Sequence, residues 1–126
     1  MSRASETGKL GETAVRQYLE AKGAKILAQN YRTAGGEIDI IAVMGDELLF
    51  VEVKTRRPGA MVSGFESITP KKQMLLIRTA MQYCNEHIID LQPRFDAAEV
   101  YMAGGRVLDI DYLENAFDMS DCDIIF

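Results

Sequence analysis

The 126-residue sequence lacks the long apolar run that a membrane-spanning helix requires. Such a helix needs roughly 20 consecutive apolar residues, and no stretch reaches that length. The first residues contain no apolar signal region, so we expect a cytoplasmic protein. Cysteine is also scarce, because Cys84 and Cys122 are far apart and belong to no metal-binding motif. We therefore expect reduced thiols rather than a disulfide or a zinc site.

The chain lacks the positive charge of a non-specific nucleic-acid binder, because its net charge is -5. The charges are unevenly distributed. Residues 54–78 carry six basic residues and one acidic residue, whereas residues 85–126 carry ten acidic and two basic residues. This pattern predicts a basic side and an acidic side, with an ordinary solvated surface as the alternative.

Length and composition predict the domain organisation. A chain of 126 residues fits one domain with one core, and the sequence contains no internal repeat or low-complexity tract. We predict a single domain over residues 1–117, followed by an acidic, loosely held tail over residues 118–126.

The most informative stretch is 36–56, which predicts two neighbouring β-strands joined by a turn. Apolar residues dominate both Ile38–Val43 and Leu48–Val53, and Gly45-Asp46 supplies the turn. The rest of the chain is predicted to support this hairpin.

Four charged residues interrupt the apolar frame of the hairpin. Glu37 and Asp39 lie in its first strand, and Glu52 and Lys54 lie in its second. Because strand side chains alternate between faces, the members of each pair share a face. Burying such charges is costly unless they are paired or hold a metal ion.

Helical periodicity predicts two helices. The first runs from Ser5 to Lys22, and the second begins at Thr69-Pro70 and runs to about Asn85. Threonine is a good N-cap, and proline suits the first helical position. Glu12 falls at the edge of the apolar stripe of the first helix, where an ordinary surface glutamate is the alternative to a site residue.

The remaining segments predict strands and connections. We expect strands at Lys25–Asn30, Arg94–Met102 and Arg106–Ile110, with a Gly104-Gly105 hairpin between the last two. The strands before and after the second helix form a βαβ unit and are predicted to be parallel and right-handed. The other segments are predicted to be a loop at Tyr31–Gly35 carrying Arg32, a mobile loop at Arg56–Ser67, and a short helical turn at Tyr112–Phe117.

The charged residues of the hairpin suggest a metal-dependent reaction. Asp39 and Glu52 on adjacent strands offer the hard oxygen ligands that Mg²⁺ or Mn²⁺ prefers. Lys54 does not bind such ions, but it can orient a metal-bound water and stabilise charge developing on a phosphate. This division of labour fits phosphodiester hydrolysis, although many surface hairpins carry similar charges.

Asp39 followed by Glu52-Val53-Lys54 resembles the split D…E-x-K signature of restriction-endonuclease-like nucleases. The chain also resembles the YraN-like family of predicted bacterial endonucleases, which are distantly similar to archaeal Holliday-junction resolvases. This resemblance covers roughly residues 8–117, and the runs that carry it are Gly8–Leu19, Asn30–Arg32, Gly36–Ala42, Phe50–Arg56 and Arg94–Asp96.

The resemblance implies an α/β, restriction-endonuclease-like core, with a central mixed sheet flanked by helices and a metal site on one sheet edge. It assigns Asp39 and Glu52 as metal ligands, together with the backbone carbonyl of Val53, and Lys54 as the motif lysine. Glu12 corresponds to an acidic residue that the resolvases bring from their first helix. Gln73 corresponds to a polar active-site neighbour in some relatives.

The leading hypothesis is a metal-dependent endonuclease that acts on DNA, including branched or damaged DNA during repair. The alternative is a nuclease-fold binding or assembly module that a protein partner recruits, and an RNA substrate also stays open. Resolvases act as symmetric dimers, so a homodimer is a further expectation from the resemblance. In the leading hypothesis the catalytic residues are Glu12, Asp39 and Glu52, which hold one or two Mg²⁺ ions, and Lys54, which positions the attacking water. The phosphates are contacted by Arg32, Arg56, Arg57, Lys71 and Lys72.

Overall fold

The computed structural model describes residues 3–57 and 68–117, with the side chains described from Gly8 onward. The predicted loop beyond Arg57, the predicted tail and Cys122 lie outside the described residues. The elements follow one another as α1 (Arg3–Ala21), β1 (Lys25–Thr33), β2 (Gly36–Met44), β3 (Glu47–Arg56), α2 (Pro70–His87), β4 (Gln92–Ala103) and β5 (Arg106–Phe117).

The strands form one five-stranded mixed sheet in the order β1-β2-β3-β4-β5. β3 and β4 are parallel, and the other neighbouring pairs are antiparallel. The parallel pair follows from the connection through α2, because a crossover returns the chain to the same end of the sheet. The predicted α/β class and the parallel β3–β4 pair are confirmed, and the architecture is consistent with a restriction-endonuclease-like core.

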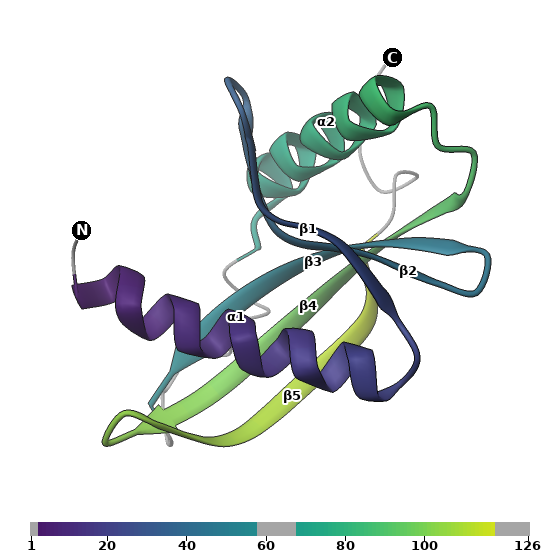
Figure 1. Cartoon of the computed structure of the whole chain (residues 1–126). Helices are drawn as coiled ribbons and strands as arrows, with labels where there is room; N and C mark the ends of the chain where they lie inside the picture. The colour runs from purple at the N-terminus through teal and green to yellow at the C-terminus, as the bar shows by residue number, and fades with distance from the viewer. Residues whose placement is uncertain (1–2, 58–67, 118–126) are drawn as a thin grey trace.

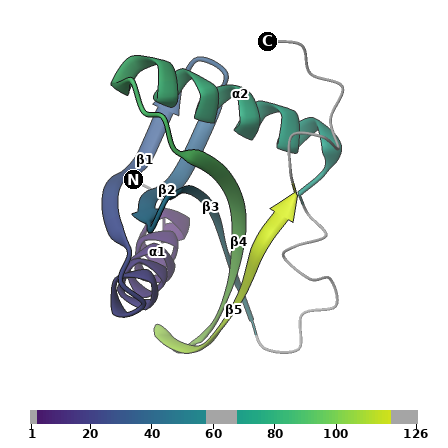
Figure 2. The same ribbon diagram turned by 90° about the vertical axis from the view of Figure 1, so that its right-hand side faces the viewer.

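The two helices pack on opposite faces of the sheet, as Figures 1 and 2 show. Alternation along β3 supplies both faces with apolar side chains. Val15 and Leu19 of α1 pack with Val51, whereas Ile77 of α2 packs with Phe50. These two apolar layers fix the helices against the strands that carry the charged residues.

The start of α2 is fixed by local chemistry that the sequence predicts. Thr69 is the N-cap, and its side-chain oxygen accepts a hydrogen bond from the backbone N of Lys72 at 3.2 Å. Pro70 occupies the first turn, where its missing N–H costs nothing. The cap therefore positions the first turn of α2, including Lys72, over the sheet.

Two predicted segments are wrong. Tyr31–Thr33 continues β1 rather than forming a loop, because it pairs with the start of β2 down to Thr33 opposite Gly36. Residues Tyr112–Phe117 continue β5 rather than forming a helical turn. They pair with β4, with Tyr112 opposite Ala98, so cross-strand hydrogen bonding outweighs the local helical preference.

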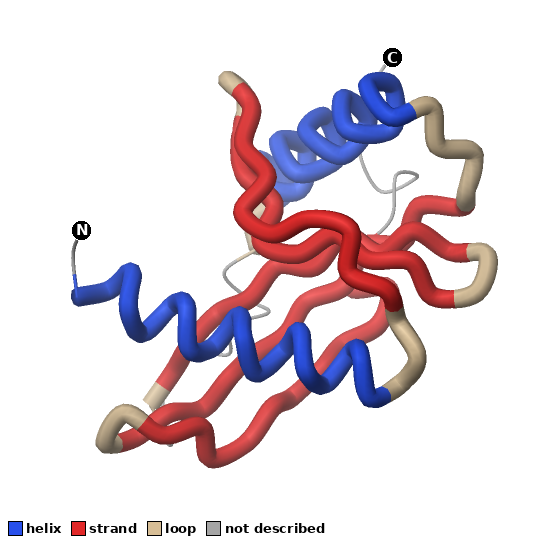
Figure 3. The backbone as a smooth tube through the Cα atoms, viewed as in Figure 1, coloured by secondary structure: helices blue, strands red, loops and turns tan. Residues whose placement is uncertain are grey.

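The β1–β2 hairpin extends beyond its pairing with β3. Figure 3 shows its end rising past the rest of the sheet beside α2. The rings of Tyr31 and Tyr83 lie 5.1 Å apart, edge to face, and the Tyr31 hydroxyl donates a hydrogen bond to Glu86. These contacts hold the projecting end of the hairpin on α2 and away from β3.

Candidate active site

The candidate site lies where β2 separates from β3. The recorded pairing of the two strands runs from Met44 opposite Glu47 to Ile40 opposite Val51. Past this point the backbone N of Val53 donates to Asp39 Oδ2 at 2.8 Å. The Asp39 carboxylate thus accepts the hydrogen bond that a backbone carbonyl of β2 would accept if the two strands stayed paired. It is held in the gap where the strands diverge, which we call the fork.

Glu52 forms ion pairs with two lysine side chains at this fork. The Nζ of Lys72 lies 2.9 Å from Glu52 Oε1, and the Nζ of Lys54 lies 3.4 Å from the same oxygen. Glu52 is only 8% exposed, whereas each lysine side chain keeps about a third of its surface exposed. Lys72 reaches Glu52 because the capped first turn of α2 packs on the face that carries Glu52.

Asp39, Glu52, Val53 and Lys54 line a single pocket of about 390 Å³. The predicted core of the site is therefore brought together. The pocket belongs to β2 and β3, the second and third strands of the sheet. The divergence of these two inner strands opens the pocket. Its other lining residues are Gly36, Glu37, Lys72, Leu75 and Leu76.

The electrostatics of the pocket are dominated by crowded negative charge. Burial and then the nearby Glu52 raise the pKa of Asp39 from 3.8 to about 7, against the opposing effect of the Val53 hydrogen bond. Glu12 and Glu37 raise it further. Asp39 therefore titrates near neutral pH, which is a feature of many functional carboxylates.

The pKa of Lys54 is also shifted from its ordinary value. Burial lowers its pKa, and the neighbouring Lys72 lowers it further, while Glu52 acts in the opposite direction. Two ammonium groups thus share one carboxylate in a partly buried place. Both lysines therefore pair with Glu52, and about a third of each lysine side chain stays exposed.

Glu12 on α1 lies near the pocket carboxylates but does not line the pocket. Burial raises its pKa, a hydrogen bond with Asn30 lowers it, and Glu37 and Glu52 raise it. Glu12 therefore interacts electrostatically with the pocket carboxylates, as expected for a residue at the edge of the apolar stripe of α1.

Asn30 forms a hydrogen bond with Glu12 that no sequence pattern predicts. This residue has a φ of 53°, in the left-handed region that asparagine tolerates better than most residues. It lies between Gln29 and Tyr31, whose partners on β2 are Ile40 and Ile38, so it stands opposite Asp39. Asn30 thus connects Glu12 of α1 to the strand beside the fork.

The predicted phosphate-contacting residues lie in different places. Lys72 joins the pocket, and Lys71 is exposed beside it on α2. Arg32 lies 3.3 Å from Glu37 through its Nε. Arg56 and Arg57 line a different hollow. The basic segment therefore does not converge on the carboxylates as a unit.

Gln73 follows the pocket residue Lys72 on α2 and is not among the residues that line the pocket. Its Nε2 donates to the backbone carbonyl oxygen of Ile68 at 3.1 Å, which secures the chain just before α2. The Gln73 side chain thus turns toward the backbone that leads into the N-cap of α2.

The family of the chain follows from comparison with known proteins. The profile of the Uncharacterised protein family UPF0102 matches residues 11–100, which is more than half of the chain. The chain belongs to this family. A UPF0102 protein of Alkaliphilus oremlandii is 44% identical over 113 residues, covering 87% of this chain and 96% of the relative. A UPF0102 protein of Clostridioides difficile is 44% identical over 113 residues, covering 89% and 96%.

A more distant UPF0102 protein, from Nitrosomonas europaea, is 39% identical over 120 residues and spans 95% of this chain and all of the relative. These findings confirm the YraN-like resemblance. The matched region of the UPF0102 profile contains Glu12, Asp39, Glu52, Lys54 and Lys72, and all of β5 lies beyond it. The names of these relatives give a family and no activity.

Two further observations describe this UPF0102 chain. Within residues 3–57 and 68–117, no three acidic, histidine or cysteine side chains form a ready-made metal-binding group. No helix in the described part of the chain is long and apolar enough to cross a membrane. The pocket therefore contains the carboxylates of Glu37, Asp39 and Glu52 together with two lysines, and Glu12 acts on it from outside the lining.

Proposed function

We propose that this protein is a metal-dependent endonuclease that hydrolyses phosphodiester bonds of DNA. The observation that carries the proposal is the meeting of Asp39, Glu52 and Lys54 in one pocket of about 390 Å³. The two carboxylates come from strands that diverge at this point, so their charges face an open volume rather than a packed core. Phosphodiester hydrolysis needs such a combination of hard oxygen ligands and a nearby cation.

The chemistry of the donor set fits a divalent cation. Burial and then the negative charge of Glu52 raise the pKa of Asp39 to about 7, and a bound cation would relieve the repulsion between the two carboxylates. Asp39 and Glu52 would hold Mg²⁺ or Mn²⁺, with the backbone carbonyl of Val53 as the further ligand that the resemblance implies. When bound, such an ion acts as a Lewis acid and lowers the pKa of water.

The lysines of the pocket have separate roles in the proposal. Lys54 lies on the same strand face as Glu52, and its lowered pKa suits a group that orients an attacking water and stabilises charge at the phosphate. Lys72 lies at the capped first turn of α2, where helix backbone N–H groups also favour an anion. A phosphate that enters the pocket would therefore meet two ammonium groups.

One observation favours a second function, a nuclease-fold binding or assembly module recruited by a partner. Lys54 and Lys72 both already pair with Glu52, so this half of the pocket is neutralised by the chain itself. The net charge of -5 also disfavours tight autonomous binding to DNA. In this alternative the pocket residues would bind nucleic acid or stabilise the fold, and the protein would not hydrolyse phosphodiester bonds.

A cleavage panel distinguishes the two functions. Labelled single-stranded, duplex, flap and four-way-junction DNA, with RNA counterparts, would be incubated with the protein and Mg²⁺ or Mn²⁺. We expect cleavage by the parent protein and a loss of roughly a hundredfold or more in Asp39→Asn. The matched control is Asp46→Asn, because Asp46 lies in the turn of the same hairpin and outside the pocket lining.

The lysine provides a second test of the same proposal. Lys54→Met should reduce cleavage far more than it reduces DNA binding, because its assigned role is chemical. DNA binding without cleavage of any substrate by the purified parent would replace the endonuclease by the binding module. Cleavage that persists in Asp39→Asn would point to a contaminating nuclease and remove the support for the proposal.

A further inference from the structure

The β1–β2 hairpin loses the regular alternation of its side chains at one level. Ala28 and Tyr31 of β1 lie three positions apart, and both pack on the side of the sheet that α2 covers. Ile38 and Ile41 of β2 do the same. Each strand therefore slips by one position here, which accompanies the rise of the hairpin past the rest of the sheet (Figure 3). In β1 the slip includes Asn30.

The backbone of Asn30 has an unusual conformation within this slip. Its φ of 53° lies in the left-handed region, which costs free energy for any residue with a side chain and least for asparagine and aspartate. In the register of the two strands Asn30 stands opposite Asp39. The strained residue of β1 therefore lies beside the carboxylate at the fork, and strain of this kind is often kept at functional sites.

The side chain of Asn30 forms a hydrogen bond with Glu12 of α1. This bond favours the charged form of the Glu12 carboxylate, so the amide of Asn30 is the donor. Glu37 and Glu52 act in the opposite direction, because their negative charges repel that of Glu12. Asn30 therefore helps to hold Glu12 toward carboxylates that would otherwise push it away.

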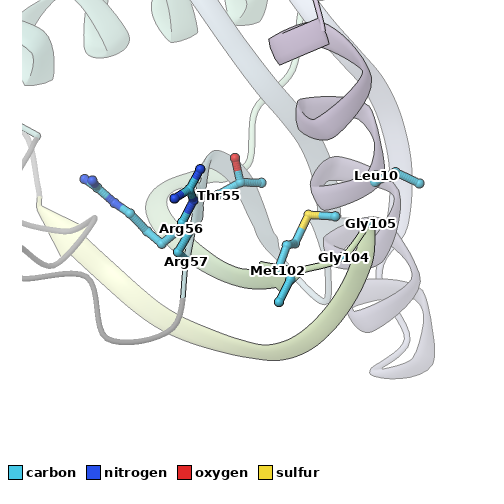
Figure 4. Close-up of a pocket in the computed structure, with 8 residues that line it drawn as sticks. Leu10, Thr55, Arg56, Arg57, Met102, Gly104 and Gly105 are labelled. Atoms are coloured by element: carbon cyan, nitrogen blue, oxygen red, sulfur yellow. The ribbon is translucent and has the colours of Figure 1, made fainter.

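The backbone of α1 comes close to the sheet next to Glu12. A Cβ atom added to Gly11 would lie 2.5 Å from Cγ2 of Thr55 on β3, so a larger residue there would force the helix or the strand to move. Figure 4 shows the adjoining region, where Leu10 and Thr55 both line a hollow of about 690 Å³. Gly11 thus sets the distance between α1 and β3, whereas Asn30 directs the side chain of Glu12.

We propose that Asn30 is a positioning residue of the candidate active site, which directs the Glu12 carboxylate toward the cation that Asp39 and Glu52 would hold. Without this hydrogen bond, Glu12 would turn away from the carboxylates that repel it. Groups that orient the ligands of a metal ion strongly influence its affinity. The inference rests on the proposed endonuclease function, because it requires a cation at the fork.

Replacement by glycine separates the side chain of Asn30 from its backbone. Glycine adopts positive φ angles readily, so Asn30→Gly keeps the conformation of β1 and removes the donor to Glu12. Asn115→Gly is the matched control, because Asn115 has a φ of 54° on β5 and does not line the pocket. The backbone N of Asn115 donates to Asp96, and glycine retains that donor. Both variants are therefore expected to fold.

Calorimetric titration with Mn²⁺ is the main measurement, and chemical denaturation in EDTA checks the fold of each variant. Asn30→Gly should bind Mn²⁺ roughly tenfold more weakly than the parent, whereas Asn115→Gly should match the parent. The denaturation midpoints of both variants should stay close to that of the parent. In the cleavage assay, excess Mn²⁺ should restore Asn30→Gly, because Asn30 acts through the metal site.

A double variant shows whether Asn30 acts through Glu12. Glu12→Ala alone should weaken Mn²⁺ binding at least as much as Asn30→Gly does. Adding Asn30→Gly to Glu12→Ala should cause no further loss, because the hydrogen bond has already lost its acceptor.

The outcomes distinguish this inference from the proposed function. Unchanged Mn²⁺ affinity in Asn30→Gly, together with lost binding in Asp39→Asn, would leave the metal site intact and reject the role of Asn30 alone. Fully additive losses in the double variant would also reject that role, since Asn30 would then act independently of Glu12. If the parent and Asp39→Asn bind Mn²⁺ equally, the metal site of the proposed function fails and the positioning role fails with it.

Discussion

Asp96 and Asp39 are both located on strands of the sheet, but they have contrasting electrostatic surroundings. Asp96 on β4 is 1% exposed and fully surrounded by donors. Arg94 donates to it twice, from Nε at 2.9 Å and from Nη2 at 2.8 Å, and the Asn115 backbone N and the Tyr112 hydroxyl donate as well. Asp39 on β2 accepts a backbone hydrogen bond from Val53, and the lysines near it pair with Glu52 instead.

The comparison separates a structural carboxylate from a functional candidate. A buried charge that is paired and hydrogen-bonded on every side ties strands together, and Asp96 joins β4 to β5 in this way. The same cluster reaches β3, because Arg94 also donates to Glu47 at 2.9 Å. Asp39 is instead crowded by other carboxylates, which raise its pKa beyond the effect of burial. Such an uncompensated carboxylate beside an open pocket is suited to a cation.

The same substitution at the two positions gives the largest expected effect at Asp96. Asp96→Asn removes the charge that compensates Arg94, so we expect the free energy of unfolding to fall by about 3 kcal/mol. Chemical denaturation at pH 7.5 in metal-free buffer measures the change. A loss below the error of the measurement would mean that Glu47 and Glu114, which also lie near Arg94, already compensate it.

At Asp39 the same substitution should stabilise the protein. Folding raises the pKa of this carboxyl from 3.8 to about 7, so between these pH values the folded state binds a proton that the unfolded state has lost. The contribution of Asp39 to stability therefore falls as pH rises through this window. Asp39→Asn should raise the free energy of unfolding by about 2 kcal/mol at pH 8 without metal, and by nothing below about pH 4.

Denaturation curves of both proteins from pH 4 to pH 8 measure this pH-dependent difference. Asp46→Asn is the control for removing one acidic charge from the same hairpin. If Asp39→Asn destabilises the protein at pH 8, Asp39 serves chiefly as the acceptor for Val53, and the contrast with Asp96 disappears. Addition of Mn²⁺ should reverse the order, because only the parent retains both metal carboxylates.

The smallest expected effect concerns the partner of Glu52. The Lys72 ammonium lies 2.9 Å from Glu52 Oε1 and competes with a divalent cation for that carboxylate. Lys72→Met should therefore bind Mn²⁺ roughly tenfold more tightly, a change of about 1.4 kcal/mol. Lys71→Met is the matched control, because Lys71 is the exposed neighbour on the same helix and does not line the pocket.

Calorimetric titration with Mn²⁺ measures both variants beside the parent. Unchanged or weaker Mn²⁺ binding in Lys72→Met would show that Glu52 does not ligate the metal. In that event Glu52 would resemble Asp96, as a carboxylate satisfied by its own cations.

Sequence reasoning found the central hairpin, both helices and the carboxylate pair for identifiable reasons. The nearly continuous apolar run from Leu48 to Val53 and the Thr69-Pro70 cap are local signals that survive in the folded chain. The loop at Tyr31 and the helical turn at Tyr112 were wrong because both segments are strands only through their partners. The residues that pair with a strand are in another part of the chain, so the sequence of the strand alone does not reveal the pairing that stabilises it.

The sequence by itself determined which residues can carry chemistry and how they alternate along β2 and β3. Only the tertiary structure decided which of these residues contact one another. Charged residues with similar spacing along their strands are surrounded by different side chains in the folded protein, and those side chains come from distant parts of the chain. The Arg94-Phe-Asp run, which sequence reasoning used as a family signal, proved to be a structural cluster once Tyr112 and Asn115 were brought to it. Lys72 proved to be a partner of Glu52 because the capped end of α2 packs over β3. Local propensity specifies each element, whereas the compensation of a buried charge depends on residues far away in the chain.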